Sequence, residues 1–170
     1  MNIILIGFKN CGKTSVGQSM AKKMAAPFID TDNLIEQHYY NLNNRSLSTN
    51  EIYQKHGENY FRELEANIIN DLKDTEKSVI ATGGGSLLNP DNIITLKKLG
   101  EIIYLLIPFY LIEIRNRLQP KPAFLNDQFT LADIYEQRKD IYSKAANIII
   151  NAENKSIDII ADEIILFIKA

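Results

Sequence analysis

The stretch that decides the fold of this chain is Asn2-Ile3-Ile4-Leu5-Ile6-Gly7-Phe8-Lys9-Asn10-Cys11-Gly12-Lys13-Thr14. Residues 2–6 are an apolar run without helical periodicity, which is typical of a buried strand in a parallel sheet. Residues 7–14 match the pattern G-x-x-x-x-G-K-[ST] in full. Apolar side chains at helical spacing follow, at Val16, Met20, Ala21 and Met24. Strand, glycine-containing loop and helix therefore occur in the order that the pattern requires.

This loop has the composition of a phosphate-binding site. Glycines permit positive φ and close backbone approach, so successive N–H groups can bind phosphate oxygens, and the following helix adds its positive end. Lys13 is predicted to contact the β- and γ-phosphates of ATP, and the Thr14 hydroxyl to contact Mg²⁺. The nucleotide contacts expected in the loop are Asn10, Cys11, Gly12, Lys13, Thr14 and Ser15. The alternative is a strand-to-helix turn that carries Lys-Thr by chance.

Two positions in the loop allow more than one interpretation. Asn10 is one of the few residue types that tolerate the left-handed conformation, so it need not disturb the loop. Cys11 lies at a helix N-terminus, where a thiol can become reactive. The alternative is packing of a small side chain in the loop, and this simpler interpretation is preferred for Cys11.

Strand-like and helical patterns alternate along the rest of the chain. Short apolar runs at 28–30, 78–81, 102–107 and 147–150 are separated by stretches with helical periodicity. This alternation predicts an α/β fold, a three-layer sandwich in which helices cover both faces of a five-stranded parallel sheet. With 170 residues and no linker, residues 1–170 are expected to form one domain.

Composition excludes several classes of protein. Nineteen basic against 21 acidic residues give a formal charge of −2, which offers no overall attraction for nucleic acid or anionic lipid. A single cysteine cannot form an internal disulfide. The apolar run at the N-terminus is too short for a signal peptide or a membrane span. We therefore expect a cytoplasmic monomer without nucleic-acid or membrane partners.

Three further features suggest a site for a second substrate. Asp30 and Asp32 end the second predicted strand, where one acid can hold Mg²⁺ and the other can bind a substrate hydroxyl, although helix capping explains them equally well. Gly83-Gly84-Gly85 follows another strand, as a substrate-binding turn or merely a flexible one. Arg62 and Arg138 are candidate anion ligands, or solvated arginines paired within their helices.

Taken together, these segments resemble the shikimate kinases. The resemblance rests on the phosphate loop, Asp30-Thr31-Asp32, Phe61-Arg62-x-x-Glu65, the triple glycine, and Arg138 with Tyr142, in this order across almost the whole chain. It implies a P-loop fold like that of the nucleoside-monophosphate kinases. It also implies transfer of the γ-phosphate of ATP to the 3-hydroxyl of shikimate, a step toward chorismate and the aromatic amino acids.

The resemblance also implies a role for each matching residue. Asp30 would assist Mg²⁺ together with Thr14, and Asp32 would contact substrate hydroxyls and act with Lys13 in catalysis. The carboxylate of shikimate would be bound by Arg62 and Arg138, with a backbone contact from Gly84. Residues of about 31–73 would form the substrate-binding helices, and residues of about 115–130 a short lid.

The lid departs from the pattern of the family. Relatives usually have an arginine where this chain has Lys121, and a lysine lacks the bidentate guanidinium. Slower turnover is therefore expected, unless a neighbouring arginine substitutes. Arg117 and Lys121 are the expected nucleotide contacts here; Arg115 or Arg117 can stack on adenine or simply face solvent. Alternatives for the whole chain are a related small-metabolite kinase, such as a gluconate kinase, or a non-catalytic nucleotide-binding relative.

Overall fold

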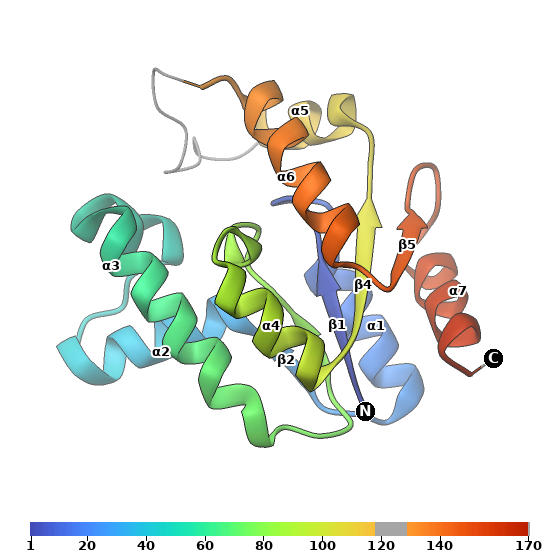
Figure 1. The fold of residues 1–170 in the computed structure, drawn as a ribbon, viewed down its shortest axis with the longest axis horizontal. Coiled ribbons are helices and arrows are strands. Elements are labelled where there is room, and N and C mark those ends of the chain that lie inside the picture. Colours follow the sequence, from blue (N-terminus) through green and yellow to red (C-terminus); the bar gives the residue numbers. More distant parts are fainter. Residues whose placement is uncertain (118–128, 170) are drawn as a thin grey trace.

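The computed structural model describes residues 1–117 and 129–169, and Figure 1 shows their arrangement. Five parallel strands form one sheet in the order β2-β3-β1-β4-β5. The strands are β1 (Asn2–Ile6), β2 (Phe28–Asp30), β3 (Val79–Ala81), β4 (Gly100–Leu106) and β5 (Ile148–Asn151). Because every pairing is parallel, the carboxyl ends of the strands lie at one edge, which is where ligands bind in open α/β sheets.

Helices cover both faces of this sheet, which confirms the three-layer prediction (Figure 1). On one face, α1 (Lys13–Met24) packs beside α7 (Ile157–Lys169). On the other face, α4 (Pro90–Leu99) and α6 (Leu131–Ala145) pack against β4. The short α5 (Phe109–Arg117) follows β4, and two 3₁₀ turns are η1 (Leu72–Asp74) and η2 (Ser86–Leu88).

Two helices form a separate layer beside the sheet. They are α2 (Thr31–Asn43) and α3 (Thr49–Asp71), which pack on each other and extend to the left in Figure 1. They share a small core of their own: Ile35, Tyr39, Ile52, Phe61, Leu64 and Ile68. At Gly57, α3 has a local break with φ 84° and ψ 173°, after which the helix continues. Helix α2 continues into the polar, asparagine-rich segment and ends at Asn43.

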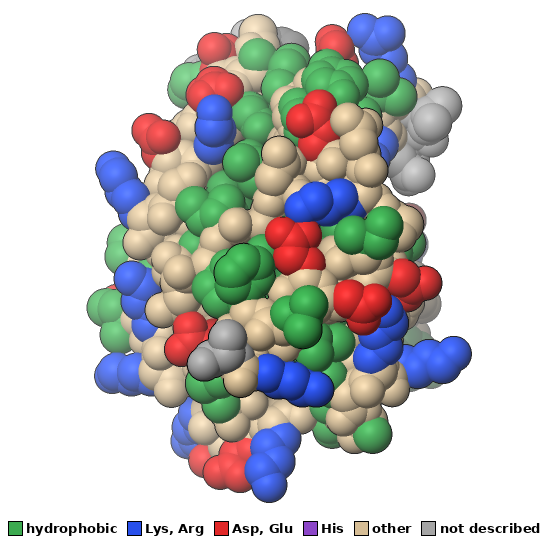
Figure 2. Space-filling view, turned by 90° about the vertical axis from the view of Figure 1, so that its right-hand side faces the viewer, with side chains coloured by type: hydrophobic (Ala, Val, Ile, Leu, Met, Phe, Trp, Pro, Cys, Tyr) green, Lys and Arg blue, Asp and Glu red, His purple; other side chains and the backbone are tan. Residues whose placement is uncertain are grey.

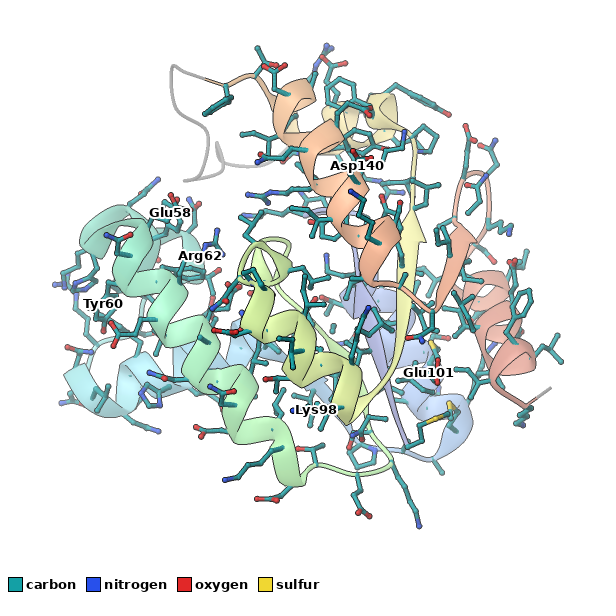
Figure 3. All side chains as sticks on the ribbon, in the orientation of Figure 1. Glu58, Tyr60, Arg62, Lys98, Glu101 and Asp140 are labelled. Atoms are coloured by element: carbon teal, nitrogen blue, oxygen red, sulfur yellow. The ribbon has the colours of Figure 1, made fainter. Side chains whose placement is uncertain are left out.

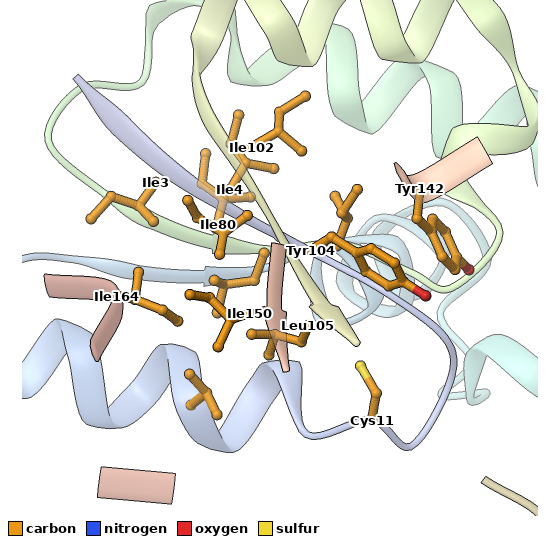
Figure 4. Packing of buried hydrophobic residues seen from close by; sticks show 14 of the residues in the cluster. Ile3, Ile4, Cys11, Ile80, Ile102, Tyr104, Leu105, Tyr142, Ile150 and Ile164 are labelled. Atoms are coloured by element: carbon orange, nitrogen blue, oxygen red, sulfur yellow. The ribbon is translucent and has the colours of Figure 1, made fainter. Parts of the chain in front are cut away.

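The main core lies around the central strands. All five residues of β1 are buried, and Figure 4 shows isoleucine side chains of β1, β3 and β4 packed together. The isoleucine-rich helix α7 packs on this core through its buried residues Ile160, Ala161 and Ile164. Figure 2 shows the face around β5 and α7, on which acidic, basic and apolar side chains are mixed. None of the described helices has the length and apolar character needed to cross a bilayer.

Candidate active site

The phosphate loop connects β1 to α1 and has the predicted backbone conformation. Asn10 adopts φ 65° and Gly12 adopts φ 106°, so Asn10 does occupy the left-handed region that its residue type tolerates. No side chain caps the first turn of α1, and no acidic residue lies in that turn. The N-terminus of α1 therefore presents backbone N–H groups and a positive dipole end, as anion binding requires.

Lys13 lies inside this loop. Its side chain is buried, and its Nζ donates hydrogen bonds to the carbonyls of Gly7 and Phe8, both at 2.9 Å. A buried ammonium group that lines a cavity is positioned to neutralise bound phosphate. Cys11 is also buried, with its Sγ 3.8 Å from the Lys13 Nζ, an arrangement consistent with packing of a small side chain.

Asp30 links the end of β2 to the start of α1. Its Oδ2 accepts a hydrogen bond from the Thr14 hydroxyl at 2.8 Å, and its Oδ1 caps α2 by accepting from the Asp32 N–H at 3.0 Å. Asp30 therefore caps the helix and also lines the site, so its two interpretations are compatible. A hydroxyl and a carboxylate side by side are oxygen donors of the kind that Mg²⁺ prefers.

Asp32 lies deeper, beside the glycine turn. A Cβ atom added to Gly83 would lie 2.8 Å from the Asp32 Oδ1, so only a glycine leaves room for this carboxylate. Burial, followed by repulsion from the Asp30 carboxylate, raises the pKa of Asp32 to about 6. An acid whose pKa is raised toward neutrality in a cavity is a candidate general base.

Arg62 reaches the same cavity from α3. Its Nη1 donates to the Glu65 Oε2 at 2.8 Å, and its Nε lies 3.5 Å from the Glu58 Oε1 (Figure 3 labels Arg62 and Glu58). The expected alternative of an i, i+3 pair is thus present, but Glu65 is only 1% exposed. Glu65 also accepts a hydrogen bond from the Ser86 hydroxyl at 2.8 Å. Arg62 is therefore fixed against the cavity wall and is not a solvated arginine.

Arg138 approaches from α6 and is 4% exposed, which rules out the solvated alternative. Its Nη1 donates to the Gly84 carbonyl at 3.2 Å, and its guanidinium lies over the Phe8 ring, 5.5 Å from the centroid. Burial lowers the pKa of Arg138. A guanidinium group that lines a cavity is suited to bind a carboxylate or a phosphate through paired hydrogen bonds.

The three consecutive glycines each contact a different part of the site. A Cβ atom added to Gly83 would lie close to Asp32. A Cβ atom added to Gly84 would lie 3.0 Å from the backbone nitrogen of Lys9, and one added to Gly85 would lie 2.4 Å from the Nη1 of Arg62. The turn therefore packs between the phosphate loop, the acidic residue and the arginine. Close approach of these neighbours, rather than flexibility, explains the glycines.

One cavity of about 640 Å³, a size typical of small-molecule sites, joins these groups. Predicted residues that line it are Asn10, Cys11, Gly12, Lys13, Thr14, Ser15, Asp30, Asp32, Arg62, Gly84 and Arg138. Sequence reasoning did not identify Ala152, Lys155 and Ile157, which also line the cavity. These three residues come directly after β5. This strand pairs with β4 at the edge of the sheet, and the sequence alone does not reveal that pairing.

The structure places the arginines at the start of the predicted lid in two different environments. Arg115 lines the cavity and donates to the Asn10 carbonyl at 2.8 Å. The side chain of Arg117 is 72% exposed, pairs with Glu113 at 3.3 Å, and is not among the lining residues. The structure therefore brings Arg115, and not Arg117, to the loop. Lys121 lies outside the described residues.

A phosphate loop beside a cavity lined by carboxylates and arginines defines a class of protein, the P-loop kinases. The model of the family described as shikimate kinase matches residues 9–169, and the chain belongs to this family. Shikimate kinases of Caldanaerobacter subterraneus and Clostridium botulinum are 36% and 39% identical over 167 and 158 residues. The matches cover 96% and 91% of this chain, and 94% and 89% of the relatives. The protein is an ATP-dependent phosphotransferase.

Solved structures agree with the architecture. The shikimate kinase of Aquifex aeolicus is 32% identical, with a TM-score of 0.82 and coverage of 99% of this chain and 96% of that one. The shikimate kinase of Acinetobacter baumannii, in complex with shikimate, is 29% identical, with a TM-score of 0.86 and coverage of 99% and 92%. A gluconokinase from Sinorhizobium meliloti, 15% identical with a TM-score of 0.57, shares the fold alone.

Proposed function

We propose that this protein transfers the γ-phosphate of ATP, with Mg²⁺, to the 3-hydroxyl of shikimate. The observation that carries the proposal is that Lys13, Asp32, Arg62 and Arg138, from four separate segments, line one cavity. A small carboxylate with several hydroxyls fits this set, since guanidinium groups bind carboxylates and a carboxylate accepts hydrogen bonds from hydroxyls. The relative whose structure contains shikimate supports the same acceptor.

The nucleotide would occupy the end of the cavity next to α1. The loop amides and Lys13 would bind the β- and γ-phosphates. Four further residues line the cavity together with the loop: Arg115, Ala152, Lys155 and Ile157. They offer apolar surface and a planar guanidinium group against which the flat adenine base could pack. Arg117 and Lys121 remain proposed contacts of the lid, which we place at about residues 115–130.

Thr14 and Asp30 would hold Mg²⁺, because their oxygens are hard donors beside the phosphate loop. The ion, when bound, neutralises charge that develops on the phosphates during transfer. The chain itself supplies Lys13 for the same purpose, from a position that is already buried. Catalysis would then rest mainly on positioning and on charge stabilisation.

The acceptor would lie between α3, α6 and the glycine turn, so residues of about 31–73 form the acceptor-binding helices. Arg62 and Arg138 would bind the carboxylate, and the Gly84 backbone would contact the ring substituents. Asp32 would orient the 3-hydroxyl and accept its proton as the oxygen attacks the γ-phosphorus. A pKa of about 6 leaves Asp32 ionised at neutral pH while keeping it basic enough for this step.

All proposed site residues come from one chain, so we propose that a monomer is the working unit, in the cytoplasm. Size-exclusion chromatography with light scattering tests the monomer: a mass near 19.4 kDa is expected. A stable dimer that loses activity on dilution would contradict it.

A coupled assay of ADP release tests the proposed reaction. ATP and Mg²⁺ are supplied with shikimate, gluconate or a nucleoside monophosphate in parallel. We expect ADP release that depends on shikimate, is lost in Lys13→Met, and is retained in the control Lys22→Met, which changes an exposed lysine of the same helix. Activity with gluconate alone would indicate the related metabolite kinase, and ATP binding without turnover on any acceptor would indicate a non-catalytic relative.

A further inference from the structure

The carbonyl of Gly84 receives two hydrogen bonds from α6. Arg138 donates from Nη1 at 3.2 Å, and the hydroxyl of Tyr142 donates to the same oxygen. Residues 138 and 142 are one helical turn apart, so both side chains project from one face of α6. Arg138 lines the cavity, whereas Tyr142 is fully buried behind it and is not a lining residue. Helix α6 therefore holds the middle of the glycine turn through one residue that lines the cavity and one that is buried.

Fixing this carbonyl also fixes the next amide. The peptide between Gly84 and Gly85 is planar and trans, so the Gly85 N–H points opposite to the Gly84 C=O. Both glycines line the cavity, and Gly85 lies directly against the Arg62 guanidinium. Rotation of this peptide would shift the backbone groups next to Arg62 and alter the hydrogen bond to Arg138. The Gly84–Gly85 peptide is thus in contact with both arginines of the proposed acceptor site, Arg62 and Arg138.

The surroundings of Tyr142 keep its hydroxyl in place as a donor. Its ring packs against Tyr104, with centroids 5.2 Å apart, and Figure 4 shows the two rings side by side with Cys11 of the phosphate loop close by. Burial raises the pKa of the Tyr142 phenol, so the hydroxyl keeps its proton at neutral pH. Without this phenol, only the bond from Arg138 at 3.2 Å would remain among these two to hold the carbonyl.

We propose that Tyr142 is a positioning residue for the acceptor: its hydroxyl fixes the Gly84–Gly85 peptide and thereby orients the backbone and the arginines that bind shikimate. The inference rests on the proposed function, because it assigns Tyr142 to the shikimate end of the cavity. It predicts that loss of the hydroxyl affects shikimate and leaves the nucleotide almost unaffected, since Lys13 and the loop are held by other bonds.

Tyr142→Phe tests the proposal, because it removes only the hydroxyl. Tyr135→Phe is a matched control: Tyr135 is also a buried tyrosine of α6 whose hydroxyl donates to a backbone carbonyl, that of Ile107 at 2.7 Å. We expect Tyr142→Phe to raise the KM for shikimate about tenfold and to change the KM for ATP less than about twofold. The control should change neither constant, while thermal melts show both variants folded.

Calorimetric titration of shikimate into the nucleotide-free enzyme should show the same loss of affinity for Tyr142→Phe. An unchanged KM for shikimate, or equal losses for both substrates in both variants, would overturn the role of Tyr142 and leave only a structural one. Wild-type activity separates the two proposals. If the wild type releases ADP with shikimate, a negative result concerns Tyr142 alone; if it does not, the proposed function fails and the role of Tyr142 fails with it.

Discussion

The Nη1 of Arg62 lies 2.8 Å from the Oε2 of Glu65, a carboxylate that is almost completely buried. The other oxygen of Glu65 accepts a hydrogen bond from the Ser86 hydroxyl, which begins the 3₁₀ turn after the three glycines. One acidic side chain therefore holds both the α3 arginine and the glycine turn. An arginine fixed in this way loses little conformational freedom when it binds a carboxylate.

Glu65→Gln should weaken this support. The glutamine amide has no negative charge, and its NH₂ group would face either the Arg62 guanidinium or the Ser86 hydroxyl, which are both donors to Glu65. One of these two buried hydrogen bonds is therefore lost. We expect the KM for shikimate to rise about tenfold and the free energy of unfolding to fall by about 1–3 kcal/mol. Steady-state kinetics and urea titration measure the two effects. Glu63→Gln, on the exposed side of the same helix, is the control, and a KM like that of the control would contradict the role of Glu65.

The pH dependence of the reaction should report the state of Asp32. Burial and the Asp30 carboxylate raise the pKa of Asp32 to about 6, and only its ionised form can accept a proton. We expect kcat/KM for shikimate to fall about tenfold for each pH unit below about pH 6. A profile that stays flat down to pH 5 would show that Asp32 does not act as the base.

The same pKa shift predicts that ionised Asp32 destabilises the folded protein, whereas an ion-paired carboxylate usually stabilises it. The folded protein binds this proton more tightly than the unfolded chain, in which the carboxyl has a pKa of 3.8, so ionisation of Asp32 costs stability. The cost is absent below about pH 3.8 and fully present above about pH 6. Asp32→Asn should therefore increase the free energy of unfolding at pH 7 by about 3 kcal/mol, with a smaller gain at acidic pH. A variant that is less stable than wild type at pH 7 would refute the shift.

The two arginines of α5 can be separated by substitution. Arg115 lines the cavity and bonds to the phosphate loop, whereas Arg117 pairs with Glu113 on the surface. We expect Arg115→Ala to raise the KM for ATP several-fold, on the scale of one lost hydrogen bond to a charged group. Arg117→Ala tests the sequence-based prediction for that residue. A rise in the KM for ATP in Arg117→Ala alone would contradict the placement of the base beside Arg115.

Lys121 gives a prediction that depends on sequence alone. A lysine provides a point charge where the resemblance implies a planar guanidinium, and a charge in the proposed lid would contribute to phosphoryl transfer. Lys121→Arg should therefore raise kcat, and rapid-quench measurement of the transfer step distinguishes this from faster product release. An unchanged rate of transfer would show that the lysine is not limiting.

Local patterns predicted most of the fold and the chemistry of the phosphate loop. Residues 7–14 are contiguous, so their geometry follows from glycine positions and the neighbouring strand and helix. The order of the strands, with β3 between β2 and β1, was not predicted, because hydrophobic runs do not specify their neighbours. The end of α2 at Asn43 was not predicted either, because a polar segment rich in asparagine can still be helical.

The acceptor site was only partly predictable. Arg62 and Arg138 were identified through their motifs, but the burial of Glu65 and the position of Tyr142 behind Gly84 depend on contacts between distant segments. A pattern of i, i+3 charges looks the same on a solvated helix as on one that faces a cavity. Only the packing of α3 and α6 around the glycine turn distinguishes the two cases.

The central claim is that Arg62 and Arg138 bind the carboxylate of shikimate across from the phosphate loop. Calorimetry with shikimate and its uncharged methyl ester tests this claim most directly, in the wild type and in Arg62→Ala. We predict that the wild type prefers shikimate at least about tenfold and that Arg62→Ala loses most of this preference while ATP affinity is retained. Equal affinity of the wild type for shikimate and its methyl ester would contradict the account.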